Sequence, residues 1–277
     1  MTVSVVIPTH NRAHTLPRAI NSVLLQSCKD TEIIVVDDRS TDNTRQMLSA
    51  YEGVLYVNNG HCRGPAGARN QGVESASGEY VAFLDSDDEW SLGHLEESLT
   101  YLEKHKLAAS YALWYRQHGN FWEGYPPEWL GFLVNELLLE VDGPAIMLGD
   151  RIAEYMVSKP FWCFHLDTLV ARKDAIQKVG MFDESFHSAE DMEFSFRLLM
   201  GGPACLINSY HARYYEGDDN MVALRTEDPV RLKRHRANMV MAFKKIEGLV
   251  DILFPETDKA RCHEQIERKI REYEVLR

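Results

Sequence analysis

The sequence predicts an α/β protein with a mostly parallel central sheet flanked by helices. Over the first hundred residues, short β-branched runs alternate with longer stretches in which apolar residues recur at helical spacing, the pattern of strand–helix–strand units. In addition, 45% of the 277 residues are hydrophobic. That content is enough for one large domain, or for one domain with an appendage.

The first elements follow from these patterns in chain order. Pro17 suits the first turn of the first helix, and Gly64 and Gly67 stand beside the start of the third. We expect strands at residues 3–7, 32–36, 54–58 and 80–84, and helices at 16–25, 41–51 and 66–75.

The middle of the chain has a different texture. Residues 111–132 are rich in aromatic side chains and include Pro126 and Pro127, which indicates an irregular, aromatic-lined excursion. Regular structure is expected again as a strand at 166–171 and helices at 173–179 and 191–200.

The C-terminal part differs in charge. Residues 231–277 carry 12 Lys and Arg against 8 Asp and Glu, a net of +4, which leaves −16 for residues 1–230. A boundary near Pro229 follows, with a basic helical extension over 230–277 that breaks at Pro255. Its amphipathic pattern is compatible with an anionic membrane surface, with packing on its own domain, or with a homo-oligomer.

Several classes of protein are not expected. No run approaches the ~18 apolar residues of a membrane span, and the N-terminus lacks the features of a signal peptide. The five cysteines form no C-x-x-C pair, so neither a zinc site nor a disulfide framework is predicted. The charge of −12 argues against nucleic acid as a partner. We expect a cytoplasmic protein, with peripheral contact at the inner face of the membrane as an option.

Polar clusters follow three of the expected strands, at residues 8–12, 37–40 and 85–88. Ligands of open α/β sheets bind beyond the carboxyl ends of the strands. Several carboxylates after a buried strand repel one another, so Asp85, Asp87 and Asp88 call for a hard cation such as Mg²⁺ or Mn²⁺. The alternative is an acidic helix N-terminus.

Three further groups are candidates with structural alternatives. Asp38 can accept a hydrogen bond from a base or ribose, or it can help to cap the next helix. Arg69, near the start of a helix, can face a diphosphate, or it can be a surface residue. Glu190 and Asp191 stand where a helix begins, so capping explains one acid and leaves the other as a candidate general base. Neither G-x-G-x-x-G nor a Walker motif is present, which counts against NAD and ATP enzymes.

These clusters, in this order, resemble glycosyltransferase family 2, whose members have the GT-A fold. The matching stretches are residues 3–12, 34–42, 64–70, 83–88 and 182–184, followed by Glu190-Asp191 and Arg197. The resemblance implies a nucleotide-sugar site, usually for UDP, formed by Pro8, Thr9, Arg12, Asp38, Arg69, Asp85 and Ser86. It also implies a metal on the D-x-D residues Asp85 and Asp87, with Asp88 beside them, and Asp191 as the base.

The implied activity is an inverting transfer of a sugar from a nucleotide diphosphate to the hydroxyl of a glycan, lipid-linked or other acceptor. The resemblance also implies a single GT-A domain at residues 1–229, with a nucleotide-binding half (1–110) and an acceptor-binding half (111–229). Trp122, Trp162 and Glu190 are the expected acceptor residues, with ordinary core or a subunit contact as the alternative for the aromatic stretch. The third metal ligand stays open between His211, Asp218 and Asp219.

Two rival functions fit the same fold. A sugar nucleotidyltransferase also places a metal-binding Asp at the sheet edge, but it carries a glycine-rich basic loop that residues 10–14 lack. A non-catalytic nucleotide-sugar-binding protein is the other rival, and the presence of both Asp87 and Asp191 speaks against it.

Overall fold

The computed structural model describes residues 2–118, 121–124, 127–137, 139–149, 152, 155–156, 164–216, 228–253 and 256–275. The strands are β1 (Val3–Thr9), β2 (Thr31–Asp37), β3 (Val54–Asn58), β4 (Tyr80–Phe83), β5 (Glu89–Trp90), β6 (Ala109–His118), β7 (Phe121–Glu123), β8 (Val141–Asp142), β9 (Ala145–Leu148), β10 (Val170–Arg172) and β11 (Ala204–Tyr214). The helices are α1 (Leu16–Leu24), α2 (Thr44–Leu48), α3 (Pro65–Ser75), α4 (His94–His105), α5 (Pro127–Leu137), α7 (Lys173–Lys178), α8 (Glu190–Gly201), α9 (Pro229–Leu253) and α10 (Glu256–Val275).

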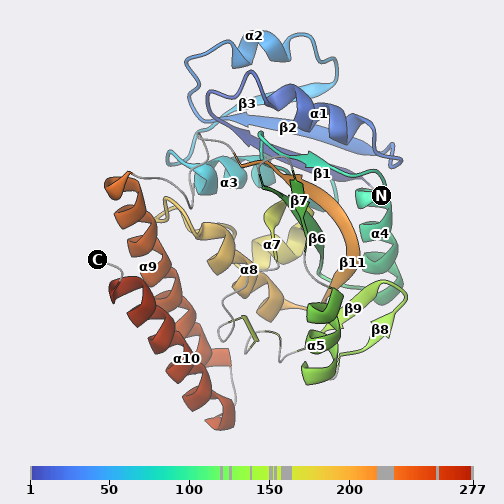
Figure 1. The fold of residues 1–277 in the computed structure, drawn as a ribbon. Helices are drawn as coiled ribbons and strands as arrows, with labels where there is room; N and C mark the ends of the chain where they lie inside the picture. The colour runs from blue at the N-terminus through green and yellow to red at the C-terminus, as the bar shows by residue number, and fades with distance from the viewer. Residues whose placement is uncertain are drawn as a thin grey trace.

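The described strands form one 11-stranded sheet in the order β3-β2-β1-β4-β10-β6-β11-β9-β8, with β5 on β11 and β7 on β6 (Figure 1). The first four strands are parallel, as expected from the alternation of strands and helices. Beyond β4 the sheet is mixed, because β10 runs antiparallel to both β4 and β6 while β11 runs parallel to β6.

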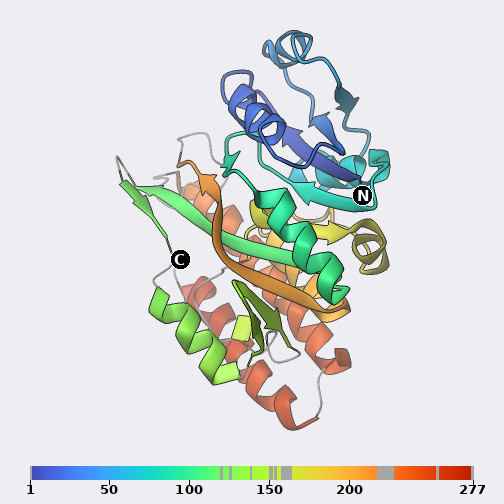
Figure 2. The ribbon, with the colours of Figure 1, turned by 90° about the vertical axis from the view of Figure 1, so that its right-hand side faces the viewer.

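Strands β1 and β4 are fully buried and β2 is buried from Ile33 on, whereas β3, at the edge of the sheet, is only partly buried, with Leu55 46% exposed. Val3, Val5 and Ile7 belong to the core that α1 and α4 cover, whereas Val6 belongs to the core that includes α3 and α8. Successive side chains of a strand point to opposite faces, so an unbroken apolar run such as 3–7 supplies both cores. Figure 2 shows α4 lying across the long strands β6 and β11.

Two expectations for the middle of the chain are wrong. Residues 109–118 form a regular strand rather than an irregular excursion, with Tyr111 and Leu113 facing one core and Ala112 the other. Aromatic residues favour strands, and Pro127 begins helix α5, where proline is tolerated. The expected strand at 166–171 starts as a 3-10 turn over Leu166–Thr168, and only Val170–Arg172 pairs with the sheet.

Two helix starts also differ from expectation. Helix α2 begins at Thr44, because Asp42 Oδ1 accepts the backbone N–H of Thr44 at 3.0 Å and holds the preceding residues in a turn. Helix α3 begins at Pro65, before Gly67. Arg69 therefore lies in the second turn of α3.

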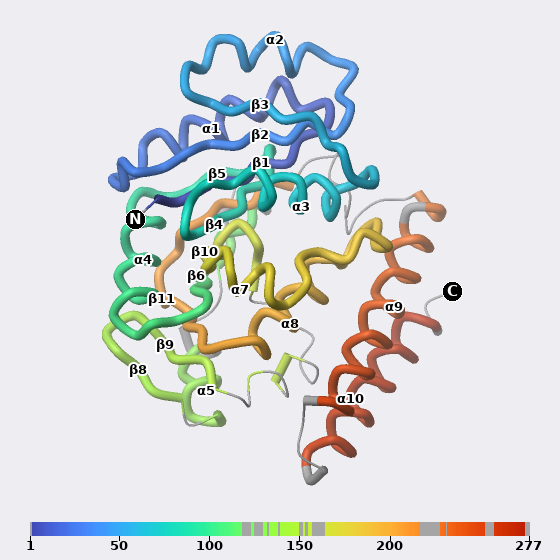
Figure 3. Tube along the Cα trace, turned by 180° about the vertical axis from the view of Figure 1, so that it is seen from behind, coloured from blue at the N-terminus to red at the C-terminus, as the bar shows by residue number. Residues whose placement is uncertain are grey.

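The C-terminal helices α9 and α10 pack against each other, and α9 lies alongside α8 (Figure 3). Ala242, Phe243 and Ile246 of α9 and Ile266 of α10 are buried in the same core as α8. The expected helices are confirmed, and the break predicted at Pro255 lies outside the described residues. No helix of the described residues is both long and apolar enough to cross a membrane.

Candidate functional site

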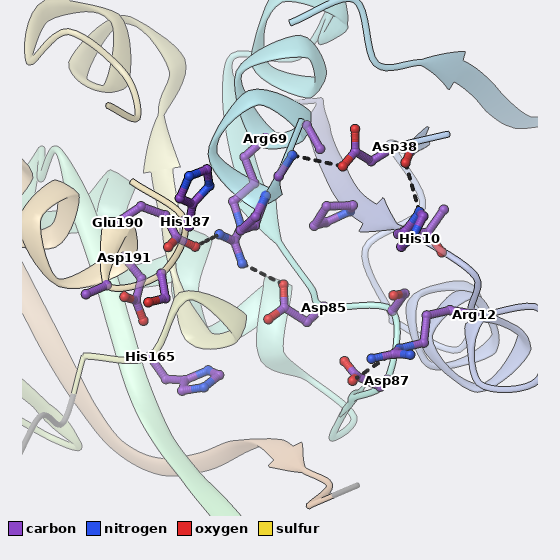
Figure 4. A pocket seen from close by; sticks show the side chains of 18 of the residues that line it. His10, Arg12, Asp38, Arg69, Asp85, Asp87, His165, His187, Glu190 and Asp191 are labelled. Carbon is purple, nitrogen blue, oxygen red and sulfur yellow. Dashed lines mark hydrogen bonds and ion pairs between the residues drawn. The ribbon is translucent and has the colours of Figure 1, made fainter. Parts of the chain in front are cut away.

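A cavity of about 800 Å³ lies at the carboxyl ends of β1, β2 and β4 and extends to α8 and α9 (Figure 4). Ten of the predicted site residues line it: Pro8, Thr9, Arg12, Asp38, Arg69, Asp85, Ser86, Asp87, Glu190 and Asp191. Asp88 is buried behind this lining. The side chain of Trp122 and the whole of Trp162 lie outside what the structure describes.

Asp38 organises the end of the cavity beside β1 and β2. Its Oδ2 accepts the backbone N–H of Gly64 at 2.8 Å, and its Oδ1 accepts from Asn59 Nδ2 at 2.8 Å. Gly64 has a φ of 126°, a conformation that glycine adopts without steric cost. Each carboxylate oxygen has two acceptor sites, so Asp38 holds the 59–64 loop and can still accept a hydrogen bond from a ligand.

Three carboxylates meet under the acidic turn, and one of them was not predicted. Asp85, Asp88 and Asp167 each place an oxygen within 4.8 Å of the others. Asp167 Oδ1 accepts the N–H of Asp85 at 2.8 Å, and Asp88 Oδ1 accepts the N–H of Tyr215 at 2.8 Å. Among the residues that the structure describes, the second oxygens of Asp88 and Asp167 are buried and accept no hydrogen bond, although His165 Nδ1 lies 3.5 Å from that of Asp167.

This group fits a hard cation, because three carboxylate oxygens converge within 4.8 Å of one another and carboxylate oxygens are the ligands that Mg²⁺ and Mn²⁺ prefer. Burial raises the pKa of both Asp88 and Asp167, and repulsion from a neighbouring carboxylate adds to it: from Asp167 on Asp88, and from Asp85 on Asp167. A bound cation would oppose these shifts. The sequence did not predict Asp167 as a site residue, because it is a single acid in a mainly apolar stretch, far along the chain from Asp85 and Asp88.

Asp87 faces the cavity on the other side of the turn. Its carboxylate lies 3.5 Å from Arg12 Nε, and Arg18 donates to its backbone carbonyl. Burial, together with repulsion from Asp85, raises the pKa of Asp87 to about 6, although Arg12 opposes this rise. Asp85 and Asp87 of the turn therefore line the cavity. Asp88 and Asp167 are buried beneath the lining and accept backbone hydrogen bonds there.

Arg69 joins the acidic turn to helix α8. Its Nη2 donates to Asp85 Oδ1 at 2.8 Å and its Nη1 to Glu190 Oε1 at 2.6 Å. Burial disfavours the charge of Arg69, but Asp85 and Glu190 outweigh it and raise its pKa. The surface alternative for Arg69 is wrong, because the side chain is buried. A role at a diphosphate stays a prediction, since Arg69 lines the cavity while its terminal nitrogens also bind Asp85 and Glu190.

The two acids at the start of α8 have different surroundings. Glu190 is buried in the ion pair with Arg69. Asp191 lines the cavity, and its Oδ1 accepts the N–H of Met192 at 2.8 Å. The first turn of a helix stabilises negative charge. Of these two acids, Glu190 is the one held by Arg69, while Asp191 is the more exposed at the cavity wall.

His211, one candidate for the third metal ligand, lies elsewhere. Its Nε2 is 2.7 Å from Glu97 Oε2, and its Nδ1 is 3.0 Å from His94 Nδ1, in a buried cluster between β11 and α4. Burial lowers its pKa despite Glu97. Asp218 and Asp219 lie outside the described residues.

The aromatic residues divide between core and cavity. Tyr111 and Phe164 are fully buried against each other, with ring centroids 5.1 Å apart. Trp114 and Tyr214 line the cavity together with His165, whose ring lies 4.8 Å from that of Trp114. The cavity also includes basic residues that sequence reasoning had not singled out: Arg63, Arg116, Arg234 and His235.

The fold and the cavity define an α/β protein with its ligand site at the carboxyl edge of a parallel sheet. The chain belongs to glycosyl transferase family 2, whose sequence profile matches residues 4–164. It is 36% identical over 115 residues to an Escherichia coli UDP-Glc:α-D-GlcNAc-diphosphoundecaprenol β-1,3-glucosyltransferase, WfaP, across 41% of this chain and 46% of that protein. It is 42% identical over 115 residues to TuaG of Bacillus subtilis, a putative teichuronic acid biosynthesis glycosyltransferase, across 39% and 45% of the two chains. The aligned regions thus span about half the length of these curated relatives.

Solved structures confirm the GT-A fold. S. aureus TarS in complex with UDP-GlcNAc superposes with a TM-score of 0.63 at 18% identity, covering 99% of this chain and 89% of that one. The mannosyltransferase PcManGT of Pyrobaculum calidifontis, in complex with GDP-Man and Mn²⁺, gives 0.63 at 19% identity, covering 99% and 73%.

Proposed function

We propose that the chain transfers a sugar from a nucleotide diphosphate, most simply a UDP-sugar, to a hydroxyl of a lipid-linked glycan, with inversion. The observation that carries this proposal is the single cavity in which Asp38, the acidic turn and Asp191 all face the same space. Two Escherichia coli relatives are named as glucosyltransferases that use UDP-Glc and GlcNAc-diphosphoundecaprenol, which supports the substrate classes.

In this reaction the nucleoside lies beside Pro8, Thr9 and Asp38, and the diphosphate lies over Asp85 and Asp87. A divalent cation held by Asp85 together with Asp88 and Asp167, the group whose oxygens lie within 4.8 Å of one another, would offset the charge that develops on the departing diphosphate. Arg12 lies beside Asp87 on the same wall. Because Arg69 binds Asp85 and Glu190 at once, its role is to hold the acidic turn against α8.

Asp191 accepts the proton of the acceptor hydroxyl while that oxygen forms its bond to the anomeric carbon. The bond from the anomeric carbon to the diphosphate breaks on the opposite face, so the configuration inverts and the nucleoside diphosphate leaves. Glu190 is a poorer candidate for the base, because its carboxylate is buried in an ion pair with Arg69. Trp114 and Tyr214 offer aromatic faces to the acceptor sugar.

The proposal is tested by a thermal-shift panel of nucleotide sugars with and without Mn²⁺. A donor at a hundred times its Kd stabilises the folded chain by about 2.7 kcal/mol, which raises Tm by several degrees. We expect that rise with a UDP-sugar and Mn²⁺ and its loss in EDTA, because the acidic turn would then repel the diphosphate.

An equal rise in EDTA would contradict the metal assignment. The absence of a shift with every nucleotide sugar would contradict the donor class. Stabilisation only by a nucleoside triphosphate with a sugar 1-phosphate would favour a nucleotidyltransferase instead.

A further inference from the structure

Helix α9 contributes directly to the cavity. Arg234 and His235, in its second turn, line the cavity together with Asp191. The position of this turn is fixed, because the buried Asn238 donates from Nδ2 to Ser188 Oγ at 2.9 Å and Lys245 forms an ion pair with Asp183. Ser188 lies only three residues before Asp191, so α9 holds the segment that leads to the proposed base.

Within the part of the chain that the structure describes, the hydrogen bonds around His235 leave one ring nitrogen for a ligand. Ser188 Oγ already accepts from Asn238, so its own hydrogen can point to His235 Nδ1, which lies 3.3 Å away. In that arrangement Nδ1 accepts and Nε2 carries the proton. Burial lowers the pKa of His235, although Asp191 opposes the shift. The ring is then a neutral donor beside Asp191.

Arg234 is a cavity arginine that forms no ion pair within the described ranges of the chain. Among the described residues, three of the other cavity arginines lie in ion pairs: Arg12 with Asp87, Arg69 with Asp85 and Glu190, and Arg116 with Glu216. Arg63 contacts His10 at the other end of the cavity. Arg234 is exposed and has no carboxylate partner in the described part of the chain, and the exposed His187 lines the same cavity.

We propose that Arg234 and His235 form a second anion subsite, which binds the phosphate or diphosphate on the anomeric carbon of the acceptor sugar. This inference rests on the proposed function. The donor diphosphate is assigned to the acidic turn, whereas α9 lies beside α8 and away from β1 and β2 (Figure 1). A sugar with its hydroxyl at Asp191 would extend its phosphate roughly one ring away, where a guanidinium and an imidazole N–H can bind it.

The test compares two acceptors that carry the same sugar, one as a short-chain alkyl diphosphate and the other as an uncharged alkyl glycoside. Arg234→Ala should raise KM for the diphosphate acceptor about tenfold or more, the scale of a lost hydrogen bond to a charged group. It should leave KM for the uncharged glycoside and the Kd of the donor unchanged. Lys233→Ala is the matched control, because it removes a charge from the same turn at an exposed residue outside the cavity lining.

Calorimetry with the short-chain diphosphate acceptor alone separates this subsite from the proposed reaction, because it needs no turnover. Wild type and Lys233→Ala should bind it alike, and Arg234→Ala at least about tenfold more weakly. Equal affinity of all three chains, or an equal loss of Arg234→Ala activity with both acceptors, would overturn the subsite. Selective binding without any transfer would keep the subsite and overturn the proposed function.

Discussion

At the residue scale, the site depends on how a few buried charges are paired. Arg69 is 4% exposed and binds Asp85 and Glu190. A buried charge is tolerated only when it is paired and hydrogen-bonded. The guanidinium of Arg69 therefore offsets the charge of Glu190, while the neighbouring Asp191 faces the cavity.

Replacing Arg69 with Met should destabilise the chain by about 3–5 kcal/mol, the range for a buried pair that loses one partner. The loss arises because Glu190 stays buried with no countercharge. Urea unfolding measures it, and the double variant Arg69→Met/Glu190→Gln should recover part of the lost stability. A single variant as stable as wild type would show that this ion pair does not hold the acidic turn to α8.

At the scale of elements, the position of helix α3 depends on Gly72, where the helix backbone packs closely against Val6 of β1. A Cβ on Gly72 would lie 2.2 Å from Val6 Cγ1, and Val6 is fully buried in β1. Neither the strand nor the side chain can move away cheaply, because interiors are close-packed. The approach of α3 to β1 in turn places Arg69 beside the acidic turn.

Gly72→Ala should therefore destabilise the fold by about 1–3 kcal/mol, the range for an overpacked core. Gly248→Ala is the matched control, because Gly248 lies in α9 with nothing within 4 Å of the added Cβ. There alanine should stabilise by about 0.5–1 kcal/mol, since glycine is unfavourable inside a helix. Denaturant unfolding of both variants gives the comparison, and a Gly72→Ala chain as stable as wild type would refute the packing argument.

At the scale of the whole molecule, the predictable features are those with a local cause. The run 3–7 and the polar residues after three of the parallel strands located the sheet and the edge where the cavity lies. The strand at 109–118 was missed because its sequence does not alternate between apolar and polar residues. Such alternation marks a strand with one exposed face, whereas this strand contributes side chains to the cores on both faces of the sheet.

Features made by long-range contacts were not predictable. Asp167 meets Asp85 and Asp88 only because β10 inserts next to β4. Arg234 and His235 reach the cavity only because α9 packs beside α8. The change in charge near Pro229 coincides with the start of α9, yet this helix shares the core of the preceding fold.

The central claim, a sugar transfer in which Asp191 removes the proton of the acceptor, is tested most directly by Asp191→Asn. The amide keeps the size of the side chain and an oxygen for the N–H of Met192, but it cannot act as a base. Donor affinity from calorimetry should stay near the wild-type value, while transfer falls about a hundredfold or more. Transfer by Asp191→Asn at a rate close to that of wild type would contradict the account.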